Sequence, residues 1–184
     1  MPSDDERLQT ILGSLKRAAA ALRDADVPYA VAGALACWAR GGPVDDGDVD
    51  LVVTSDDVAR AVAALEGAGM KPDDPPEEWL TKVHDGDVTV DLICHPSGVE
   101  VTAEVLAAAD PIEVDAVTMP VLPLEDVFVT QLMSLNEHRL AYDGLLKSAR
   151  AVREQVDWEE VRGRTAESPF ARAFFTLAEG LAVV

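Results

Sequence analysis

The chain opens with apolar residues that recur every three or four positions. Because an α-helix makes one turn in about 3.6 residues, this spacing places the apolar side chains on one face of a helix. The pattern predicts a helix from about Asp5 to Asp24 whose apolar face covers a buried surface. The residues of that face are Leu8, Ile11, Leu12, Leu15, Ala19 and Leu22.

Short apolar runs follow, separated by glycine, proline and aspartate. Such runs predict β-strands, here over 27–32, 48–53, 79–83, 88–93 and 112–121. A helix is predicted over 34–40, directly after Gly33, and another after the cap signal at 54–57. Residues 84–87 contain an Asp-Gly turn signal, so the strands on either side of them are expected to form a hairpin. The proline-rich residues 71–78 are expected to form a loop.

After Pro123 the spacing of apolar residues becomes helical. The predicted helices cover 124–137, 142–155, 158–164 and 169–181. Taken together, the pattern indicates a first region of strands and helices, followed by a C-terminal helical appendage. We place the first region at residues 1–121 and the helical region at 122–184.

Composition narrows the range of functions. Of the 184 residues, 48% are hydrophobic, which is enough for a substantial core. The 34 acidic residues outnumber the 15 basic ones, and the resulting net charge of −19 repels polyanions. Long nucleic acid is therefore an unfavourable partner.

The cysteines and the apolar runs bear on location. Cys37 and Cys94 lack metal-ligand spacing and lie among apolar residues, so we expect buried, reduced thiols and a cytoplasmic protein. The sequence shows no basic-then-apolar leader, and no apolar run approaches the roughly 20 residues that span a membrane. Neither secretion through a signal peptide nor membrane insertion is expected.

Two acids stand out on the predicted strand 48–53. Residues two apart in a strand project from the same face, so Asp48 and Asp50 present adjacent carboxylates while Val49 and Leu51 point to the core. Adjacent carboxylates repel each other unless a cation lies between them. Mg²⁺ suits this position, because it prefers hard oxygen ligands and binds one or two carboxylates together with phosphates. The alternative is a pair of acids on a solvated strand face.

Asp91 and Gly33 add two further candidate groups. Asp91 interrupts an apolar strand, and beside the Asp48 strand it would complete a site for two cations, or for one cation and an activated hydroxyl. The alternative is an exposed aspartate on an edge strand. Gly33, between strand and helix, lets a ligand approach the backbone amides at the start of the helix.

These features occur in a characteristic order: VAGALA at 31–36, GDVDLV at 47–52 and VDLI at 90–93. The order resembles the glycine motif, paired aspartates and third aspartate of the polymerase-β-type nucleotidyltransferase superfamily. Among its small bacterial members, the chain looks most like antibiotic nucleotidyltransferases and AbiEii-type toxins. The resemblance implies an α/β protein of the nucleotidyltransferase fold, with a mixed β-sheet flanked by helices and a C-terminal helical appendage.

The resemblance also implies an activity and a set of site residues. Asp48 and Asp50 would bind Mg²⁺, and Asp91 would bind a metal ion or act as the base toward the acceptor. The nucleotide phosphates would lie at Gly33 and Ala34. The implied reaction moves a nucleoside monophosphate from an NTP to an acceptor and releases pyrophosphate. The acidic chain favours a small-molecule acceptor over RNA.

Basic residues are needed because metal ions leave part of the phosphate charge uncompensated. Arg40 ends the helix that starts at Gly33, so we select it as the nucleotide-binding cation. We expect most of the other candidates to be solvated surface residues. They are Lys82, Arg139, Lys147, Arg150 and Arg153.

Three positions depart from the family pattern. Ala34 stands where the family usually has glycine or serine, Asp46 where threonine or serine is common, and Gln131 where a basic residue is often found. Two alternatives therefore stay open beside the enzyme acting on a small molecule. One is an RNA-modifying toxin with an antitoxin partner. The other is a non-catalytic member that binds a nucleotide, or a protein partner through the helical tail.

Overall fold

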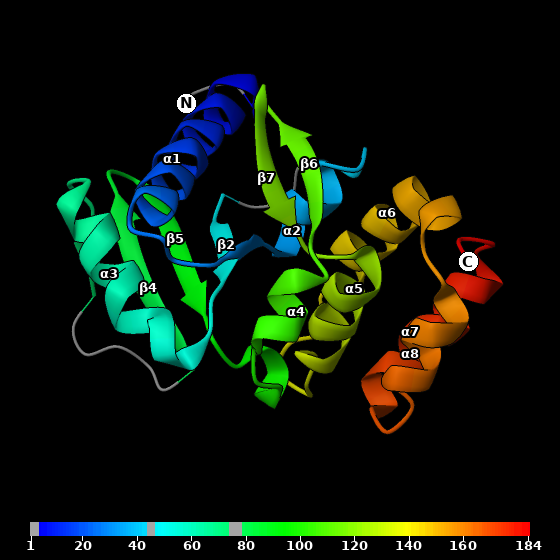
Figure 1. The fold of residues 1–184 in the computed structure, drawn as a ribbon. Coiled ribbons are helices and arrows are strands. Elements are labelled where there is room, and N and C mark those ends of the chain that lie inside the picture. Colours follow the sequence, from blue (N-terminus) through cyan, green and yellow to red (C-terminus); the bar gives the residue numbers. More distant parts are fainter. Residues whose placement is uncertain (1–3, 44–46, 74–78) are drawn as a thin grey trace.

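The strands predicted from the short apolar runs lie together in one mixed β-sheet (Figure 1). The computed structural model describes residues 4–43, 47–73 and 79–184. Within these ranges the strand order is β3-β4-β5-β2-β1-β7-β6. The strands are β1 (Ala30–Val31), β2 (Val49–Val52), β3 (Lys71–Pro72), β4 (Leu80–Asp85), β5 (Val88–Ile93), β6 (Asp110–Val114) and β7 (Val117–Val121).

The centre of this sheet combines parallel and antiparallel pairs. Strand β2 pairs in parallel with β5, and β1 pairs in parallel with β7. The pairs β1–β2, β3–β4, β4–β5 and β6–β7 are antiparallel. Strands β2 and β5 are therefore interior strands, and an acid placed on either one has neighbouring strands on both sides.

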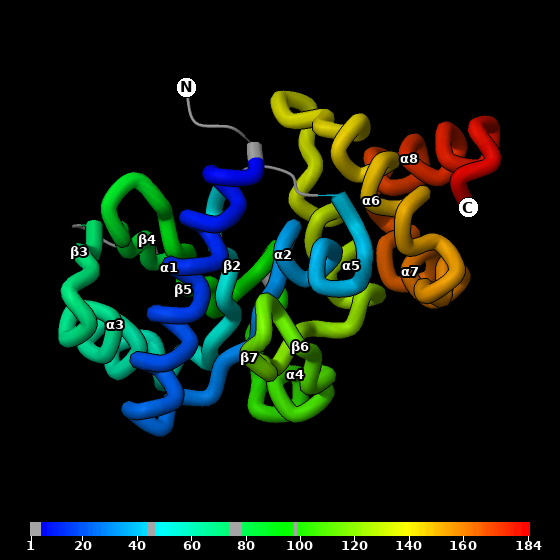
Figure 2. Tube along the Cα trace, turned by 90° about the horizontal axis from the view of Figure 1, so that it is seen from above, coloured from blue at the N-terminus to red at the C-terminus, as the bar shows by residue number. Residues whose placement is uncertain are grey.

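Helices flank the sheet, which confirms the predicted fold class. Helix α1 packs against α3, β2 and β5, whereas α2 packs against β2 and α5. Figures 1 and 2 both place α1 and α3 at one end of the molecule and α6 to α8 at the other. The helices are α1 (Asp4–Asp24), α2 (Gly33–Trp38), α3 (Val58–Gly67), α4 (Ala103–Ala107), α5 (Leu124–Met133), α6 (Tyr142–Val152), α7 (Trp158–Arg164) and α8 (Pro169–Gly180). In the part of the chain that the structure describes, no helix has both the length and the apolar character to cross a membrane.

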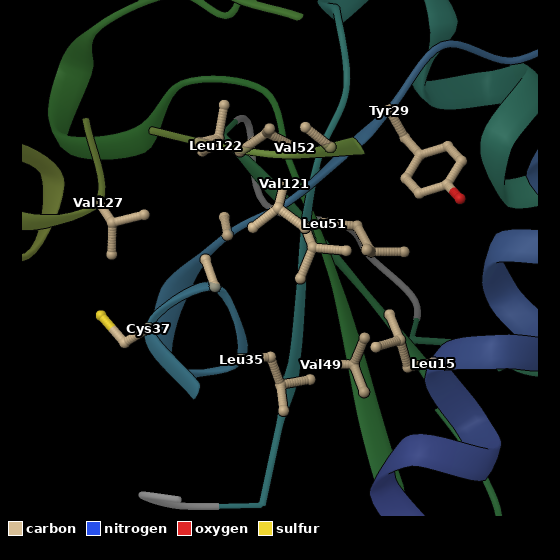
Figure 3. Packing of buried hydrophobic residues seen from close by; sticks show 14 of the residues in the cluster. Leu15, Tyr29, Leu35, Cys37, Val49, Leu51, Val52, Val121, Leu122 and Val127 are labelled. Carbon is tan, nitrogen blue, oxygen red and sulfur yellow. The ribbon is translucent and has the colours of Figure 1, made fainter. Parts of the chain in front are cut away.

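The apolar stripe of α1 supplies one side of the core. Leu15 is fully buried and lies beside Val49 of β2, and Leu35 of α2 approaches the same place (Figure 3). Leu51, also fully buried, lies on the same strand as Val49. Burying alternate residues of β2 against these helices fixes which face of the strand carries its acids.

The C-terminal helices are held together by aromatic rings. The Phe128 ring of α5 lies 4.8 Å from that of Trp158 on α7, between ring centroids. Trp158 is 6.4 Å from Phe175 of α8, which in turn contacts Phe174 at 5.4 Å. Such tilted and edge-on pairs add to the free energy of burial. The boundary of the two regions at 121/122 stays a prediction, although the Leu122 N–H still donates to the Val31 carbonyl across it.

Several predicted elements were wrong in extent. The expected strand 112–121 is a hairpin of β6 and β7, because Asp115 and Ala116 turn the chain with φ angles of 47° and 65°. Positive φ at both turn residues is usual for Asn or Gly, so the sequence carried no turn signal here. Part of the expected loop, Lys71–Pro72, forms strand β3, and the short helix α4 was not expected. The expected strand 27–32 is reduced to Ala30–Val31.

Candidate active site

Strand register places two of the three predicted aspartates opposite each other. In the parallel pair of β2 and β5, Asp50 is the partner of Asp91. In the antiparallel pair of β4 and β5, Asp91 is the partner of Lys82. The three strands lie next to one another in the sheet (Figure 1). Register partners project from the same face, so Lys82, Asp91 and Asp50 form one row across the sheet.

Asp50 is the most perturbed acid of this row. It is half-buried between the fully buried Val49 and Leu51, whereas Asp48 directly before the strand is exposed. Burial, together with the negative charges of Asp91 and Asp48, raises the pKa of Asp50 to about 6. The positive charges of Lys82 and Arg139 act in the opposite direction on this pKa. The carboxylates of Asp91 and Asp48 are thus close enough to repel the charged form of Asp50.

Asp91 is held by an ion pair. Only 8% of the residue is exposed. Its Oδ1 and Oδ2 lie 3.2 Å and 3.1 Å from the Lys82 ammonium, which donates to both. Burial raises the pKa of Asp91, while the hydrogen bond and charge of Lys82 lower it. A carboxylate buried to this extent needs such a partner.

Gly33 gives the Asp50 carboxylate room. The glycine begins α2 with a φ of +57°, and a Cβ built on it would lie 1.8 Å from Asp50 Oδ2. The Ala32 N–H donates to the Asp50 carbonyl oxygen at 2.9 Å, which ties the glycine turn to β2. The carboxylate therefore lies directly against the backbone at the start of α2, beside the half-buried Ala34. Phosphate binding at Gly33 and Ala34 stays a prediction.

Arg40 is not brought into this group of acids. Its side chain is 9% exposed, and Nη2 lies 2.8 Å from Asp110 Oδ2. The same guanidinium donates at 3.4 Å to the carbonyl oxygens of Ala36 and Val121. These contacts give Arg40 a structural task in linking α2 to β6 and β7. Its contact with a nucleotide stays a prediction.

Of two further positions that depart from the family pattern, the structure describes one. Asp46 lies outside the described residues. Gln131 is on α5, and its Oε1 is buried without a hydrogen-bond partner in the described ranges. At this point of α5 the chain therefore has an uncharged glutamine where the family often has a basic residue.

Sequence reasoning gave Lys82 and Arg139 too little weight. For Lys82 the hairpin carried a partial signal: the Asp-Gly pair at 85–86 predicts Lys82 opposite Thr89, on the same face as Asp91 but two residues away. In the structure the turn is at Gly86 and Asp87, so Asp85 pairs with Val88 and Lys82 lies opposite Asp91. Arg139 had no such signal. It lies after α5, in a turn where Asn136 and Arg139 bridge, and its charge reaches Asp50 only through the tertiary fold.

The carboxylate oxygens of these aspartates are the kind of ligand that a hard divalent cation prefers. Among the residues that the structure describes, no group of three or more His, Cys, Asp or Glu side chains is already arranged to hold a metal ion. Asp91 instead contacts Lys82, and Asp48 is exposed. Nevertheless, the repulsion from Asp91 and Asp48 that raises the pKa of Asp50 is what a cation between these carboxylates relieves. Asp48 and Asp50 are the acids free to take that cation.

The contact of Gly33 with Asp50 generates a stability prediction. Gly33→Ala should lower the free energy of unfolding by about 1–3 kcal/mol more than Gly86→Ala, because an added Cβ overpacks the site. Gly86 is a matched control: its φ of +65° carries the same backbone strain, and nothing lies within 4 Å of its Cβ position. Urea unfolding of the two variants measures the difference. The excess cost should shrink in an Asp50→Ala background, and an unchanged excess there contradicts the contact.

The raised pKa of Asp50 generates a pH prediction for the metal-free protein. A folded-state pKa of about 6 against the ordinary 3.8 means that the protonated form favours folding. This stabilisation is complete below about pH 4 and is lost as the pH rises through about 6. Asp50→Asn, which stays uncharged, should therefore gain up to about 3 kcal/mol of unfolding free energy over the wild type at pH 8, and little at pH 4. Partial exposure of the side chain reduces this upper value.

Urea titrations in EDTA at both pH values measure this effect. Asp115→Asn is the control, because it removes an acid that pairs with Lys16 away from the row. The control should lose a little stability at both pH values. A loss of stability in Asp50→Asn at pH 8 as large as at pH 4 would show that folding does not raise the pKa of Asp50.

Comparison with known proteins places this geometry in a family. A family model described as uncharacterised nucleotidyltransferase matches residues 6–182. Two solved structures of ANT(2'')-Ia are similar in fold. The solution structure of this antibiotic-resistance factor is 15% identical, covers 95% of this chain and 96% of that chain, and has a TM-score of 0.65. The crystal structure in complex with adenylyl-2''-tobramycin is also 15% identical, covers 91% and 98%, and has a TM-score of 0.66.

At this identity the two structures show the fold alone, and a search of curated proteins found no match. The family model is the stronger finding, since it covers nearly the whole chain, both the sheet with its aspartates and the C-terminal helices. The chain therefore belongs to this family of nucleotidyltransferases, as the order of its glycine turn and three aspartates indicated.

Proposed function

We propose that this nucleotidyltransferase depends on Mg²⁺ and transfers a nucleoside monophosphate from an NTP to a hydroxyl group of a small-molecule acceptor, releasing pyrophosphate. The observation that carries the proposal is the register of Asp50 opposite Asp91, with Asp48 two residues away on the same face. Three neighbouring carboxylates on or directly before interior strands of a sheet repel one another and are unfavourable by themselves. A bound cation, itself neutralised in part by the phosphates of a nucleotide, would offset this repulsion.

Asp48 and Asp50 would hold the Mg²⁺ ion in this proposal. When bound, the ion supplies positive charge against the phosphates and stabilises the charge that develops at the α-phosphorus. Asp50 is suited to this role, because the Ala32 N–H holds its backbone carbonyl oxygen and its carboxylate packs against Gly33. The phosphates would lie near Gly33 and Ala34, where the chain has no bulky side chain.

Asp91 would act on the acceptor. Its carboxylate lies on a different strand from Asp48 and Asp50, and the Lys82 ammonium keeps it in place. There it would accept the proton of the acceptor hydroxyl as that oxygen attacks the α-phosphorus. Arg139, whose charge already acts on Asp50, is better placed than Arg40 to meet the phosphates.

The charge of the chain supports a small acceptor. A net charge of −19 is unfavourable for RNA. ANT(2'')-Ia, which shares the fold, is found in complex with adenylyl-2''-tobramycin, an adenylylated small molecule. Cys37 and Cys94 are both buried thiols, which suits a reducing compartment such as the cytoplasm.

Pyrophosphate release tests the proposal directly. Each of the four common NTPs is incubated with the protein, a panel of hydroxyl-bearing small molecules, and either Mg²⁺ or EDTA. Release should require both Mg²⁺ and one class of acceptor. Labelling of RNA from an α-labelled NTP would contradict the small acceptor and favour an RNA-modifying toxin. NTP binding without release under any condition would contradict the enzyme and favour a non-catalytic member.

Asp91→Asn should separate turnover from nucleotide binding. A general base used mainly in the transition state typically contributes 10²-fold or more, so the single-turnover rate should fall by about that factor. Binding of a non-hydrolysable NTP with Mg²⁺ should stay within a few-fold of wild type, whereas Asp50→Asn should lose it. Asp115→Asn again serves as the control and should change neither quantity. Loss of nucleotide binding in Asp91→Asn equal to that in Asp50→Asn would make Asp91 a ligand of the nucleotide-bound metal instead.

A further inference from the structure

The position of Lys82 bears on how many metal ions the site holds. Its ammonium contacts both oxygens of Asp91, at 3.1 Å and 3.2 Å, so neither oxygen is left for exclusive use by a metal ion. The contact is set by the sheet, because Lys82 and Asp91 are register partners on β4 and β5. Register partners on antiparallel strands have Cβ atoms about 5 Å apart, within easy reach of a lysine side chain.

The strand also holds the lysine firmly in place. Its neighbours Thr81 and Val83 are buried, and its carbonyl oxygen accepts from the Asp73 N–H at 2.9 Å. The Lys82 side chain is 38% exposed, whereas the Asp91 side chain that it contacts is only 12% exposed. Moving the ammonium away would leave a buried acid unpaired, which is costly.

The charges in the row match a single divalent cation. Asp48, Asp50 and Asp91 together carry three negative charges when ionised, and Lys82 neutralises one of them. The remaining two lie on Asp48 and Asp50, which have no such ion pair in the described structure. One divalent ion neutralises them. Two-metal sites instead hold a second ion about 3.5–4 Å from the first, and a second divalent ion here would need the charge of Asp91.

We propose that the Lys82 ammonium takes the place of a second metal ion at Asp91, so that the transferase operates with one divalent ion on Asp48 and Asp50. This inference rests on the proposed function. Lys82 is then a positioning residue: it keeps Asp91 charged and aimed while leaving the chemistry to Asp91 itself. Three aspartates could hold either two cations, or one cation and an activated hydroxyl. The Lys82 ammonium selects the second arrangement.

Counting bound Mn²⁺ tests this inference without relying on turnover. The protein is held in excess over the α,β-methylene analogue of the NTP consumed in the pyrophosphate assay, and free Mn²⁺ is followed by electron paramagnetic resonance. Wild type should bind one Mn²⁺ per analogue. Lys82→Met, which keeps the apolar stem and removes the charge, should bind two. Lys82→Arg, which keeps the charge, should bind one.

Lys16→Met is the matched control. Lys16 is also 38% exposed along its side chain and also pairs with an aspartate, Asp115, at 2.5 Å, but it lies on α1 outside the row. This variant should bind one Mn²⁺ per analogue, like the wild type. Circular dichroism verifies that each variant is folded.

Two outcomes overturn the inference. Wild type that binds two Mn²⁺ per analogue shows that Lys82 excludes nothing, and this result needs no variant to fold. One Mn²⁺ in both wild type and folded Lys82→Met shows that some other feature limits the site. Failure of every one of these proteins to bind the Mn²⁺–analogue complex would overturn the proposed function itself, and the inference with it, which distinguishes the two failures.

Discussion

The repulsion between two carboxylates on adjacent interior strands is the constraint on which the rest of the site depends. The parallel pairing of β2 and β5 sets Asp50 opposite Asp91, where burial raises the pKa of both acids and the charge of Asp91 adds to the rise at Asp50. Such an arrangement persists only if the surrounding structure opposes the repulsion. Here the Lys82 ammonium on β4 opposes the repulsion by forming an ion pair with Asp91.

The same constraint explains features of the fold that are otherwise unrelated. Gly33 has to lack a side chain, since the Asp50 carboxylate fills the space where a Cβ would be. The β4–β5 hairpin has to keep its register, since a slip of one residue would turn Lys82 to the other face. The buried Val49 and Leu51 hold β2 so that its acids face the site. Packing, turn and ion pair therefore act together on one small patch.

The C-terminal helices take part in this patch as well as in the core. The Phe128–Trp158 contact fixes α7 on α5, and the turn after α5 carries Arg139, whose charge acts on Asp50. Arg40 and Gln155 add a link between the regions, because the Gln155 amide donates to the Arg40 carbonyl oxygen. A site built only from residues 1–121 would lack the positive charge of Arg139.

By itself, the sequence determined the fold class, the helices of the last third and the three aspartates, because these depend on periodicity and on the order of short motifs along the chain. It left the strand partner of Asp91 open, since the Asp-Gly signal at 85–86 predicts Lys82 opposite Thr89, whereas the turn at Gly86 and Asp87 sets Lys82 opposite Asp91. It did not contain the turn at Asp115–Ala116, where left-handed residues occur without glycine, or the use of Arg40 in pairing with Asp110. Tertiary packing decided which strands are neighbours and which of the six basic candidates pairs with Asp91. The physical reason is that β2 and β5 are distant in sequence, and no local pattern encodes their pairing.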